Sequence, residues 1–301
     1  MKKRIINHSL IALFCVIPTL LYAQHGNLEK QLKEIVQGKK AEIGIAVIID
    51  GKDTVTVNNE THYPLMSVFK FHQALALADY LDKQKLPLDT KIFIKKADLK
   101  PNTYSPLRDK YPNGKFEMSI AELLEYTLQQ SDNNACDILF HFQGGPKKTD
   151  YYIHSLGIHD CAIAMTENDM HSDAELCYKN WTTPLAAARL LEVFLKKPLF
   201  TKENKDFIFR TMTECETGKD RLVAPLLDKK GITVGHKTGT GDRNAKGQQI
   251  AINDIGFVLL PDGRSYSIAV FVKDSEEDDQ ANPKIIADVS RIVYEYVNHQ
   301  K

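Results

Sequence analysis

The sequence predicts an α+β fold in which an antiparallel sheet is flanked by the two terminal helices and interrupted by an inserted all-helical lobe. Strand patterns occur near both ends of the chain, at about residues 43–57 and 232–272. Helical patterns dominate residues 65–220 between them. No linker or repeat separates these regions. We therefore expect the terminal strands to form one sheet, with a cleft where the sheet meets the helical insertion.

The N-terminal part of the sheet follows a short helix. Apolar residues recur at helical spacing over residues 28–36 and predict that helix. The β-branched run 43–49 then ends at Asp50-Gly51, a dipeptide typical of tight hairpin turns. Residues 55–57 form the predicted return strand.

The C-terminal part is predicted to contain three strands and a closing helix. The strand patterns cover residues 232–236, 250–260 and 266–272. Asn282 is the predicted N-cap of the helix, with Pro283 in its first turn. Apolar residues then repeat along one helix face as far as Val297.

Three helices stand out in the insertion. Residues 67–82 are apolar almost all round, which is typical of a buried helix. Ser119 and Glu122 form a predicted capping box before the apolar run 120–128. The Thr-Pro pair at residues 183–184 opens a third helix.

Length and composition fit one two-lobed protein. The 301 residues include 43% hydrophobic ones, enough for a packed core and too many for a disordered chain. The 39 basic and 39 acidic residues are spread along the chain, which argues against a nucleic-acid-binding protein. We place an α/β lobe at residues 24–64 and 221–301 and an all-helical lobe at residues 65–220, and we expect a monomer.

The first 23 residues are typical of a secretory signal peptide. A basic start, an apolar run over residues 10–21 and a small-ended cleavage site follow in the expected order. A membrane anchor is the alternative, but the run is short for a span and contains Pro18. Lipid attachment at Cys15 is disfavoured by the bulky Phe14 before it. We expect cleavage after residue 23, which leaves 36 basic and 39 acidic residues, and a periplasmic protein without stable membrane insertion.

Four cysteines follow the predicted cleavage site: Cys136, Cys161, Cys177 and Cys215. None belongs to a C-x-x-C pair, so the spacing does not predict a zinc site. Disulfides in an exported protein could form in three pairings, and buried free thiols are an equally open alternative.

A serine and a lysine stand one helical turn apart at the start of the buried helix. Ser67 and Lys70 are separated by three positions, which places both side chains on one helix face. A serine hydroxyl is a poor nucleophile without an adjacent base, and burial favours the neutral form of a lysine that could act as one. Chance alone supplies roughly one such pair in this composition, so the pair needs context.

Three further motifs supply that context. Ser-Asp-Asn at residues 131–133 follows the capped helix, and an Asx-type helix cap is the alternative explanation. Lys-Thr-Gly at residues 237–239 lies on a predicted strand, where the glycine lets a substrate approach the strand edge or simply marks the strand end. Glu167 lies in a polar stretch and would, on its own, be a solvated surface residue.

Together these motifs resemble the class A serine β-lactamases, which combine S-x-x-K, S-D-N and K-T-G. Their order and rough spacing match, and the matching pattern runs from about residue 40 to the C-terminus. The stretch 62–71 and the loop 167–171 resemble the cephalosporinase branch of Bacteroides-type bacteria. The resemblance implies the serine β-lactamase/DD-peptidase-like fold, a small-molecule β-lactam substrate, preferably a cephalosporin, and no cofactor or metal.

The resemblance also implies the catalytic roles. Ser67 attacks the lactam carbonyl and becomes acylated. Lys70 relays or accepts its proton, and whether Lys70 or Glu167 is the acylation base is disputed for the family. Glu167 then activates a water that releases the acyl group. Ser131 passes a proton to the departing nitrogen, and Lys237 tunes the field around it.

Further residues are implied in substrate binding. They are Asn133 for the acylamide group, Thr238 and Arg221 for the carboxylate, Tyr104 for the cleft wall, and Gly239 and Thr240 along the strand edge. The backbone N–H groups of Ser67 and Thr240 would form the oxyanion hole. A packed loop tyrosine is the alternative for Tyr104.

Some positions depart from the family pattern. His171 replaces the usual asparagine four residues after the loop glutamate, which makes it a candidate ligand for the deacylating water. Met165 replaces an arginine and Asn180 its acidic partner, so we expect a loop that is looser or differently folded. Ala74 and Leu124 stand where many relatives have cysteines, which excludes that disulfide.

Two alternatives share much of this pattern. A D-alanyl-D-alanine peptidase has similar motifs, and a β-lactam sensor is acylated without turnover. Glu167 favours the lactamase because it supplies a deacylation base, and sensors are normally tethered by transmembrane segments. A zinc lactamase is disfavoured, because none of the ten histidines lies in a His-x-His-x-Asp or His-Glu-x-x-His pattern.

Overall fold

Five antiparallel strands form the central sheet, in the spatial order β2-β1-β10-β9-β8. The computed structural model describes residues 27–299; the predicted signal peptide and Cys15 lie outside them. The strands are β1 (Glu42–Ile49), β2 (Asp53–Val57), β8 (Thr233–Thr240), β9 (Gln249–Leu259) and β10 (Ser265–Ser275). β1 pairs with β10, so the two ends of the chain share one sheet, as predicted.

The β1–β2 turn and the length of β8 both bear on the sequence predictions. Asp50 and Gly51 both have positive φ, 52° and 65°, as a tight β1–β2 turn requires. β8 is longer than the predicted strand 232–236 and continues through the Lys-Thr-Gly motif. It pairs with β9 as far as Thr240, so the motif is held by strand pairing along its whole length.

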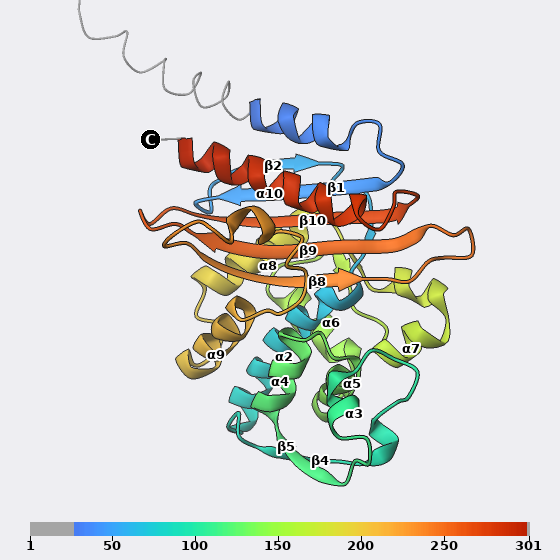
Figure 1. Ribbon diagram of the computed structural model, residues 1–301. Helices are drawn as coiled ribbons and strands as arrows, with labels where there is room; N and C mark the ends of the chain where they lie inside the picture. The colour runs from blue at the N-terminus through green and yellow to red at the C-terminus, as the bar shows by residue number, and fades with distance from the viewer. Residues whose placement is uncertain (1–26, 300–301) are drawn as a thin grey trace, which may run out of the picture.

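Alternate residues of β1 face two different hydrophobic cores. Ile43 and Ile45 pack with the helix of residues 27–36 and with α10 (Ala281–His299). Ala46 packs with the helices of the insertion on the opposite face. Figure 1 shows both terminal helices on one side of the sheet and the insertion on the other. This arrangement confirms the predicted α+β fold class.

The closing helix begins earlier than predicted. α10 starts at Ala281, so Asn282 lies inside the helix and is not its N-cap. The carboxylate of Asp278 accepts the backbone N–H groups of Gln280 and Ala281 at 2.9 and 2.7 Å. The Asn282 side chain instead accepts a hydrogen bond from the hydroxyl of Ser275 on β10. Because a carboxylate three residues upstream already binds the first free N–H groups, the asparagine is available to fix the helix to the sheet.

The insertion is mainly helical but also contains short strand pairs. Its helices are α2 (Phe69–Gln84), α3 (Pro106–Lys110), α4 (Ile120–Leu128), α5 (Asn133–Gln143), α6 (Pro146–Ser155), α7 (Glu167–Ser172), α8 (Pro184–Lys196) and α9 (Lys202–Thr213), with 3-10 turns η1 (Met66–Val68), η2 (Lys96–Asp98) and η3 (Ala174–Lys179); η4 (Ala224–Leu226) follows the insertion. Its short strands are β4 (Lys91–Ile94), β5 (Phe116–Ser119), β6 (Cys161–Ala162) and β7 (Trp181–Thr182), and β3 (Tyr63–Pro64) lies just before it. The predicted lobe is therefore not all-helical. The extended segments between its helices satisfy their backbone hydrogen-bonding groups by pairing, β4 with β5 and β7 with β3 and β6.

The four described cysteines are all free thiols, so of the two alternatives the structure has the unpaired one. Cys136, Cys161 and Cys177 are buried, whereas Cys215 is partly exposed. Within residues 27–299, no group of three or more His, Cys, Asp or Glu side chains is placed to hold a metal ion.

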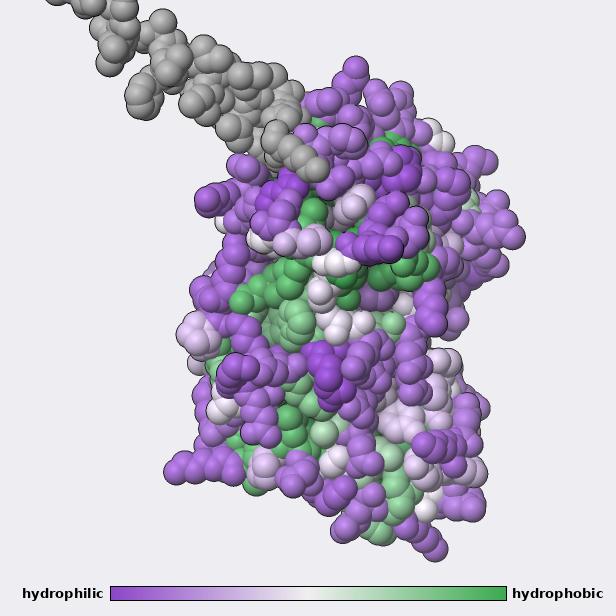
Figure 2. All heavy atoms as spheres, turned by 60° about the vertical axis from the view of Figure 1, so that its left-hand side comes forward, coloured by the Kyte–Doolittle hydropathy of each residue, from purple (hydrophilic) through white to green (hydrophobic). Residues whose placement is uncertain are grey.

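Hydrophilic side chains dominate the face of the molecule shown in Figure 2. The large hydrophobic side chains that are exposed among residues 27–299 are Phe93, Tyr104, Tyr151 and Leu227. No helix in this part of the chain combines the length and the apolar character needed to span a bilayer.

Candidate active site

The Ser-Lys pair lies where η1 leads into α2. Ser67 belongs to η1 and Lys70 to the first turn of α2, and Lys70 Nζ lies 3.0 Å from Ser67 Oγ. α2 is buried on nearly every side, and the Lys70 side chain has no exposed surface. The spacing of three residues thus brings the two side chains together, as predicted.

The Ser-Asp-Asn motif and Glu167 meet at the same ammonium group. Lys70 Nζ donates to the backbone oxygen of Ser131 at 2.7 Å and to Asn133 Oδ1 at 2.6 Å. It also lies 2.9 Å from Oε1 of Glu167, whose side chain is nearly buried. Side chains or backbone from α2, the α4–α5 connection and α7 therefore converge on one buried cation.

Ser131 occupies a strained position between α4 and α5. Its φ of 61° is in the left-handed region, which is unfavourable for a serine. The Ser131 hydroxyl accepts a hydrogen bond from Lys237 Nζ at 2.9 Å. The next residue, Asp132, caps α5 by accepting the Ala135 N–H at 2.8 Å. The helix-cap explanation of the Ser-Asp-Asn triplet is therefore correct as well, because the cap holds its two neighbours toward the lysines.

Lys237 approaches Ser131 from the sheet. It lies on β8, is fully buried, and donates to the Ser131 hydroxyl and to the backbone oxygen of Thr238 at 3.0 Å. Burial, with a smaller contribution from the positive charge of Lys70, lowers the pKa of Lys237 to about 8. Its charge state therefore changes close to neutral pH.

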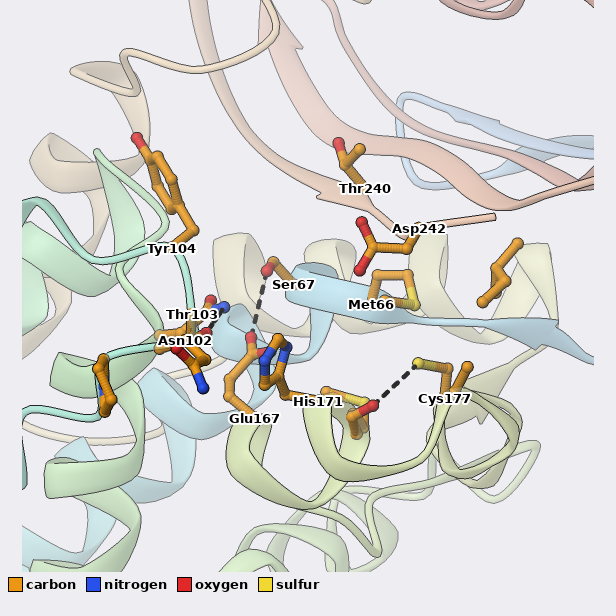
Figure 3. A pocket seen from close by; sticks show the side chains of 15 residues that line it. Met66, Ser67, Asn102, Thr103, Tyr104, Glu167, His171, Cys177, Thr240 and Asp242 are labelled. Carbon is orange, nitrogen blue, oxygen red and sulfur yellow. Dashed lines mark hydrogen bonds between the residues drawn. The ribbon is translucent and has the colours of Figure 1, made fainter. Parts of the chain in front are cut away.

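Glu167 is not the solvated surface residue that a polar stretch alone would suggest. It is the first residue of α7 and only 7% exposed. Ser67 Oγ donates a hydrogen bond to Glu167 Oε1 at 3.2 Å (Figure 3). A capping box between Thr166 and Asp169 starts the helix, and this Thr-x-x-Asp signal is visible in the sequence.

Asp137, which the sequence analysis missed, holds the backbone that carries Glu167. Its two carboxylate oxygens accept the N–H groups of Glu167 and Asn168, each at 2.9 Å. Burial and the nearby negative charge of Glu167 raise the pKa of Asp137 to about 7. Asp137 follows Asn133 by one helical turn on α5, and that spacing was the available signal.

The loop before β7 is closed by an amide instead of an ion pair. Asn180 Oδ1 accepts the N–H groups of Ala164 and Met165, both at 2.8 Å, and its Nδ2 donates to the Met165 oxygen at 2.9 Å. Asn180 is fully buried. These hydrogen bonds hold the two ends of the loop together without the ion pair, which argues against the looser of the two expected arrangements. His171 lies beside Glu167 and borders the cleft (Figure 3).

The strand side of the site is formed by β8 and Arg221. Arg221 donates to the hydroxyl of Thr240 at 2.7 Å and to the backbone oxygen of Gly239 at 3.1 Å. The Thr238 hydroxyl is buried and lies 2.6 Å from the hydroxyl of Thr217, a contact that the sequence analysis missed. Arg221 thus brings its charge to the end of β8 that faces the cleft.

Gly239 is required by packing, a reason that the sequence did not indicate. A Cβ at Gly239 would lie 2.6 Å from the backbone oxygen of Leu65 and 3.2 Å from Val68 Cγ2. Such a backbone contact is far too short. The glycine therefore lets the segment that carries Ser67 lie directly against β8.

A cleft of about 550 Å³ opens in front of these residues. The predicted residues that border it are Ser67, Asn133, Glu167, His171, Thr240 and Tyr104, whereas the remaining ones do not line it. Tyr104 is 59% exposed and stands opposite Thr240 across Ser67 (Figure 3). Asn133 Nδ2 donates to the hydroxyl of Thr103 at 2.7 Å, another neighbour that the sequence did not indicate.

Known proteins resemble this chain in both sequence and fold. A family profile described as "Beta-lactamase enzyme family" matches residues 27–297. A β-lactamase of Bacteroides uniformis is 48% identical over 289 residues, covering 95% of this chain and 97% of the relative. The crystal structure of the TLA-3 extended-spectrum β-lactamase has a TM-score of 0.88 at 44% identity and covers 91% of this chain and 99% of that one. A class A β-lactamase from Bacteroides cellulosilyticus has a TM-score of 0.87 at 46% identity, covering 91% and 98%. The chain therefore belongs to the β-lactamase enzyme family, among the class A enzymes of the Bacteroides type.

Proposed function

We propose that this β-lactamase opens the lactam ring through an acyl-enzyme on Ser67, which Glu167 then helps to hydrolyse. One observation carries the proposal: the Glu167 carboxylate lies 3.2 Å from Ser67 Oγ and 2.9 Å from Lys70 Nζ. Glu167 and Lys70 are both buried at the side of the cleft. A sensor that stays acylated has no need of a base at this position. Hydrolysis of an ester on Ser67 does require one.

For acylation, the hydrogen bonds favour Glu167 as the acceptor of the Ser67 proton. Lys70 donates to Ser67 Oγ, while the Ser67 hydroxyl donates to Glu167. Lys70, which donates to Ser67 Oγ and lies against the Glu167 carboxylate, stabilises the developing alkoxide in this route. In this route the proton moves to the carboxylate as Oγ bonds to the carbonyl carbon and the lactam C–N bond breaks. This proton replaces the one that Ser131 gives to the nitrogen, so Glu167 is again a free carboxylate for deacylation.

We propose that Ser131 protonates the leaving lactam nitrogen. Its hydroxyl is held by Lys237, and its backbone oxygen by Lys70. These two hydrogen bonds fix the position of Ser131, which suits a group that must transfer a proton to one particular atom. The two cations also favour loss of the proton from the hydroxyl.

Substrate groups are assigned to the cleft as follows. The backbone N–H groups of Ser67 and Thr240 receive the carbonyl oxygen, in the manner of an oxyanion hole. Thr240 and Thr238, with Arg221 and Lys237 behind them, receive the carboxylate, because both cations lie at this end of β8. Asn133 receives the acylamide group once its Nδ2 exchanges Thr103 for the substrate.

We further propose a preference for cephalosporins, supported by the resemblance to the cephalosporinase branch. The proposed setting is the periplasm, reached through a signal peptide at residues 1–23, with a monomer as the working form. Only scattered large apolar side chains are exposed among residues 27–299, which supports the monomer.

We also propose that the chain divides into an α/β lobe, formed by residues 24–64 and 221–301, and a helical lobe, formed by residues 65–220. In its support, every strand of the central sheet lies in the first of these lobes.

The test combines two variants with nitrocefin hydrolysis and mass spectrometry of the intact protein. We expect the wild type to turn over many times, Ser67→Ala to form no adduct, and Glu167→Gln to retain a stable adduct on Ser67. Glu175→Gln, an exposed carboxylate on the same loop, is the matched control and should behave as the wild type. A wild-type enzyme that stops after one burst would contradict the proposal and favour a sensor or a peptidase. For substrate preference, kcat/KM values that are as high for penicillins as for cephalosporins would contradict it.

A further inference from the structure

A cysteine, a histidine and an aspartate are aligned behind β8, outside the proposed catalytic machinery. Cys215 follows α9, is partly exposed, and lies beside the His236 ring. His236 Nδ1 lies 3.0 Å from Asp254 Oδ1. His236 and Thr238 lie two positions apart on β8, and Asp254 is opposite Thr238 on β9, so the three side chains share one face of the sheet.

The His236–Asp254 pair is buried and fixed in place. The exposed fractions of the two residues are 2% and 0%, and Asp254 also accepts the N–H of Leu222 at 3.2 Å. Burial alone would lower the pKa of His236, but the charge and hydrogen bond of Asp254 outweigh it and raise that pKa to about 10. His236 is therefore a cation at neutral pH and can stabilise a thiolate next to it.

Cys215 differs from the other described thiols in this respect. Burial alone would raise its pKa, but the hydrogen bond and charge of His236, together with the charge of Lys237, lower it below the ordinary value. Burial raises the pKa of Cys161 to about 12 and that of Cys177 to about 11, and it raises that of Cys136 as well. Those three cysteines are also buried, so accessibility and thiolate character coincide only at Cys215 among residues 27–299.

One side chain connects this thiol to the strand edge of the active site. The Thr217 hydroxyl lies 3.4 Å from Cys215 Sγ and 2.6 Å from the hydroxyl of Thr238. A group attached to Sγ would compete for the space of Thr217. Displacing Thr217 would free or shift Thr238, which we have assigned to the substrate carboxylate.

We propose that Cys215 is a modification site for small disulfides, and that its modification weakens β-lactam binding at the end of β8. The thiolate attacks one sulfur of the reagent, a new S–S bond forms to Cys215, and the reagent's S–S bond breaks. The other half leaves as a thiolate, so no additional oxidant or reductant is needed. The modification goes beyond the proposed hydrolysis, and only its effect on binding rests on that function.

Reactivity is tested on the wild-type protein with 4,4′-dithiodipyridine, a neutral aromatic disulfide, followed by peptide mapping. We expect Cys215 to be labelled at least about tenfold faster than Cys136, Cys161 or Cys177. Its rate should rise less steeply between pH 6 and 8 than that of an ordinary thiol, because the cations His236, Lys237 and Arg221 favour the thiolate and outweigh the opposing charge of Asp254. Faster labelling of another of these cysteines, or a rate at Cys215 that rises with pH like that of an ordinary thiol, would overturn the proposal.

The effect on binding is tested with nitrocefin on labelled and unlabelled enzyme. We expect labelling to raise KM severalfold while changing kcat less, and reduction with dithiothreitol to restore the original KM. Cys215→Ser should retain basal activity and lose the sensitivity, whereas Cys161→Ser, the buried control, should keep it. An unchanged KM in fully labelled wild type, or equal inhibition of Cys215→Ser, would overturn the link to β8. An enzyme without any turnover would instead contradict the proposed hydrolysis and leave the labelling result intact.

Discussion

Two buried lysines bind different atoms of Ser131. Lys70 holds the backbone oxygen and Lys237 the hydroxyl, so only Lys237 directly influences the group that we propose as a proton donor. Burial lowers the pKa of Lys237 to about 8, and a lysine is charged below its pKa. The charge at this end of β8 is therefore present at neutral pH and lost in mildly alkaline solution.

Lys237→Arg tests this titration. In the wild type, kcat/KM should fall with a midpoint near pH 8 as Lys237 loses its proton. Arginine stays protonated in proteins, so in the variant this limb should move to higher pH, even if the absolute activity is lower. The measurement is nitrocefin kcat/KM between pH 6 and 10. The same alkaline midpoint in both enzymes would exclude Lys237 as its source.

Asp137→Asn tests the other perturbed group of the site. The pKa of Asp137 is about 7 in the folded protein, above the ordinary 3.8. A carboxyl group whose pKa rises on folding contributes stability below its unfolded pKa, and this stability is lost as pH rises through the folded pKa. The free energy of unfolding of the wild type, relative to Asp137→Asn, should therefore fall between pH 4 and 8, by on the order of a few kcal/mol. Urea unfolding across this range measures it, and a difference that rises with pH would contradict the assignment.

At the scale of elements, local patterns predicted those helices and strands whose signals lie within a few residues. The capping box at Ser119 and Glu122 is present, and so is the tight turn at Asp50-Gly51. The prediction of Asn282 as N-cap was wrong, because Asp278 three residues before Ala281 satisfies the same backbone groups. A cap is chosen by which acceptor reaches the free N–H groups, and several nearby side chains compete for them.

The loop that carries Glu167 depends on contacts between its two ends. Asn180 makes three hydrogen bonds to the backbone of residues 164–165 and is buried. Asn180→Ala should leave two backbone N–H groups without their acceptor and destabilise the protein by about 1–3 kcal/mol. Because the same loop positions Glu167, the acyl-enzyme should also persist longer.

The control for this prediction is Asn168→Ala, an exposed asparagine on the same loop. Thermal denaturation and the lifetime of the acyl adduct should both stay close to wild type in that variant. If Asn180→Ala matched the control in adduct lifetime while losing stability, the amide would support the fold without positioning Glu167.

At the scale of the whole molecule, the sequence predicted the motif residues but not the neighbours that hold them. The Ser-Lys pair lies within one helical turn, so its geometry followed from spacing alone. Thr103 and Thr217 reach the site only through packing between separate elements, which a single sequence does not encode in any local pattern. The spacing of Asp137 from Asn133 is a local signal, but its contact with the backbone of Glu167 on α7 is not. The clash that makes Gly239 necessary likewise arises between β8 and the segment before Ser67.

The sheet separates two cores, and the site depends directly on only one of them. Val293 on α10 belongs to the core on the face away from the cleft, and Val68, next to Ser67, belongs to the other. Both side chains are fully buried, so Val293→Ala and Val68→Ala remove the same two methyl groups from comparable surroundings. Each variant should lose about 1–3 kcal/mol of unfolding free energy.

Activity should distinguish the two variants. A Cβ at Gly239 would lie 3.2 Å from Val68 Cγ2, so Val68 sits in the contact that sets Ser67 against β8. Val68→Ala should therefore lower kcat/KM for nitrocefin at 25 °C severalfold. Val293→Ala should stay within about twofold of wild type, since sites that share no contacts rarely couple. Chemical denaturation and steady-state kinetics on the same preparations provide the comparison. Equal loss of activity in both variants would mean that the site responds to global stability and not to the packing beside its nucleophile.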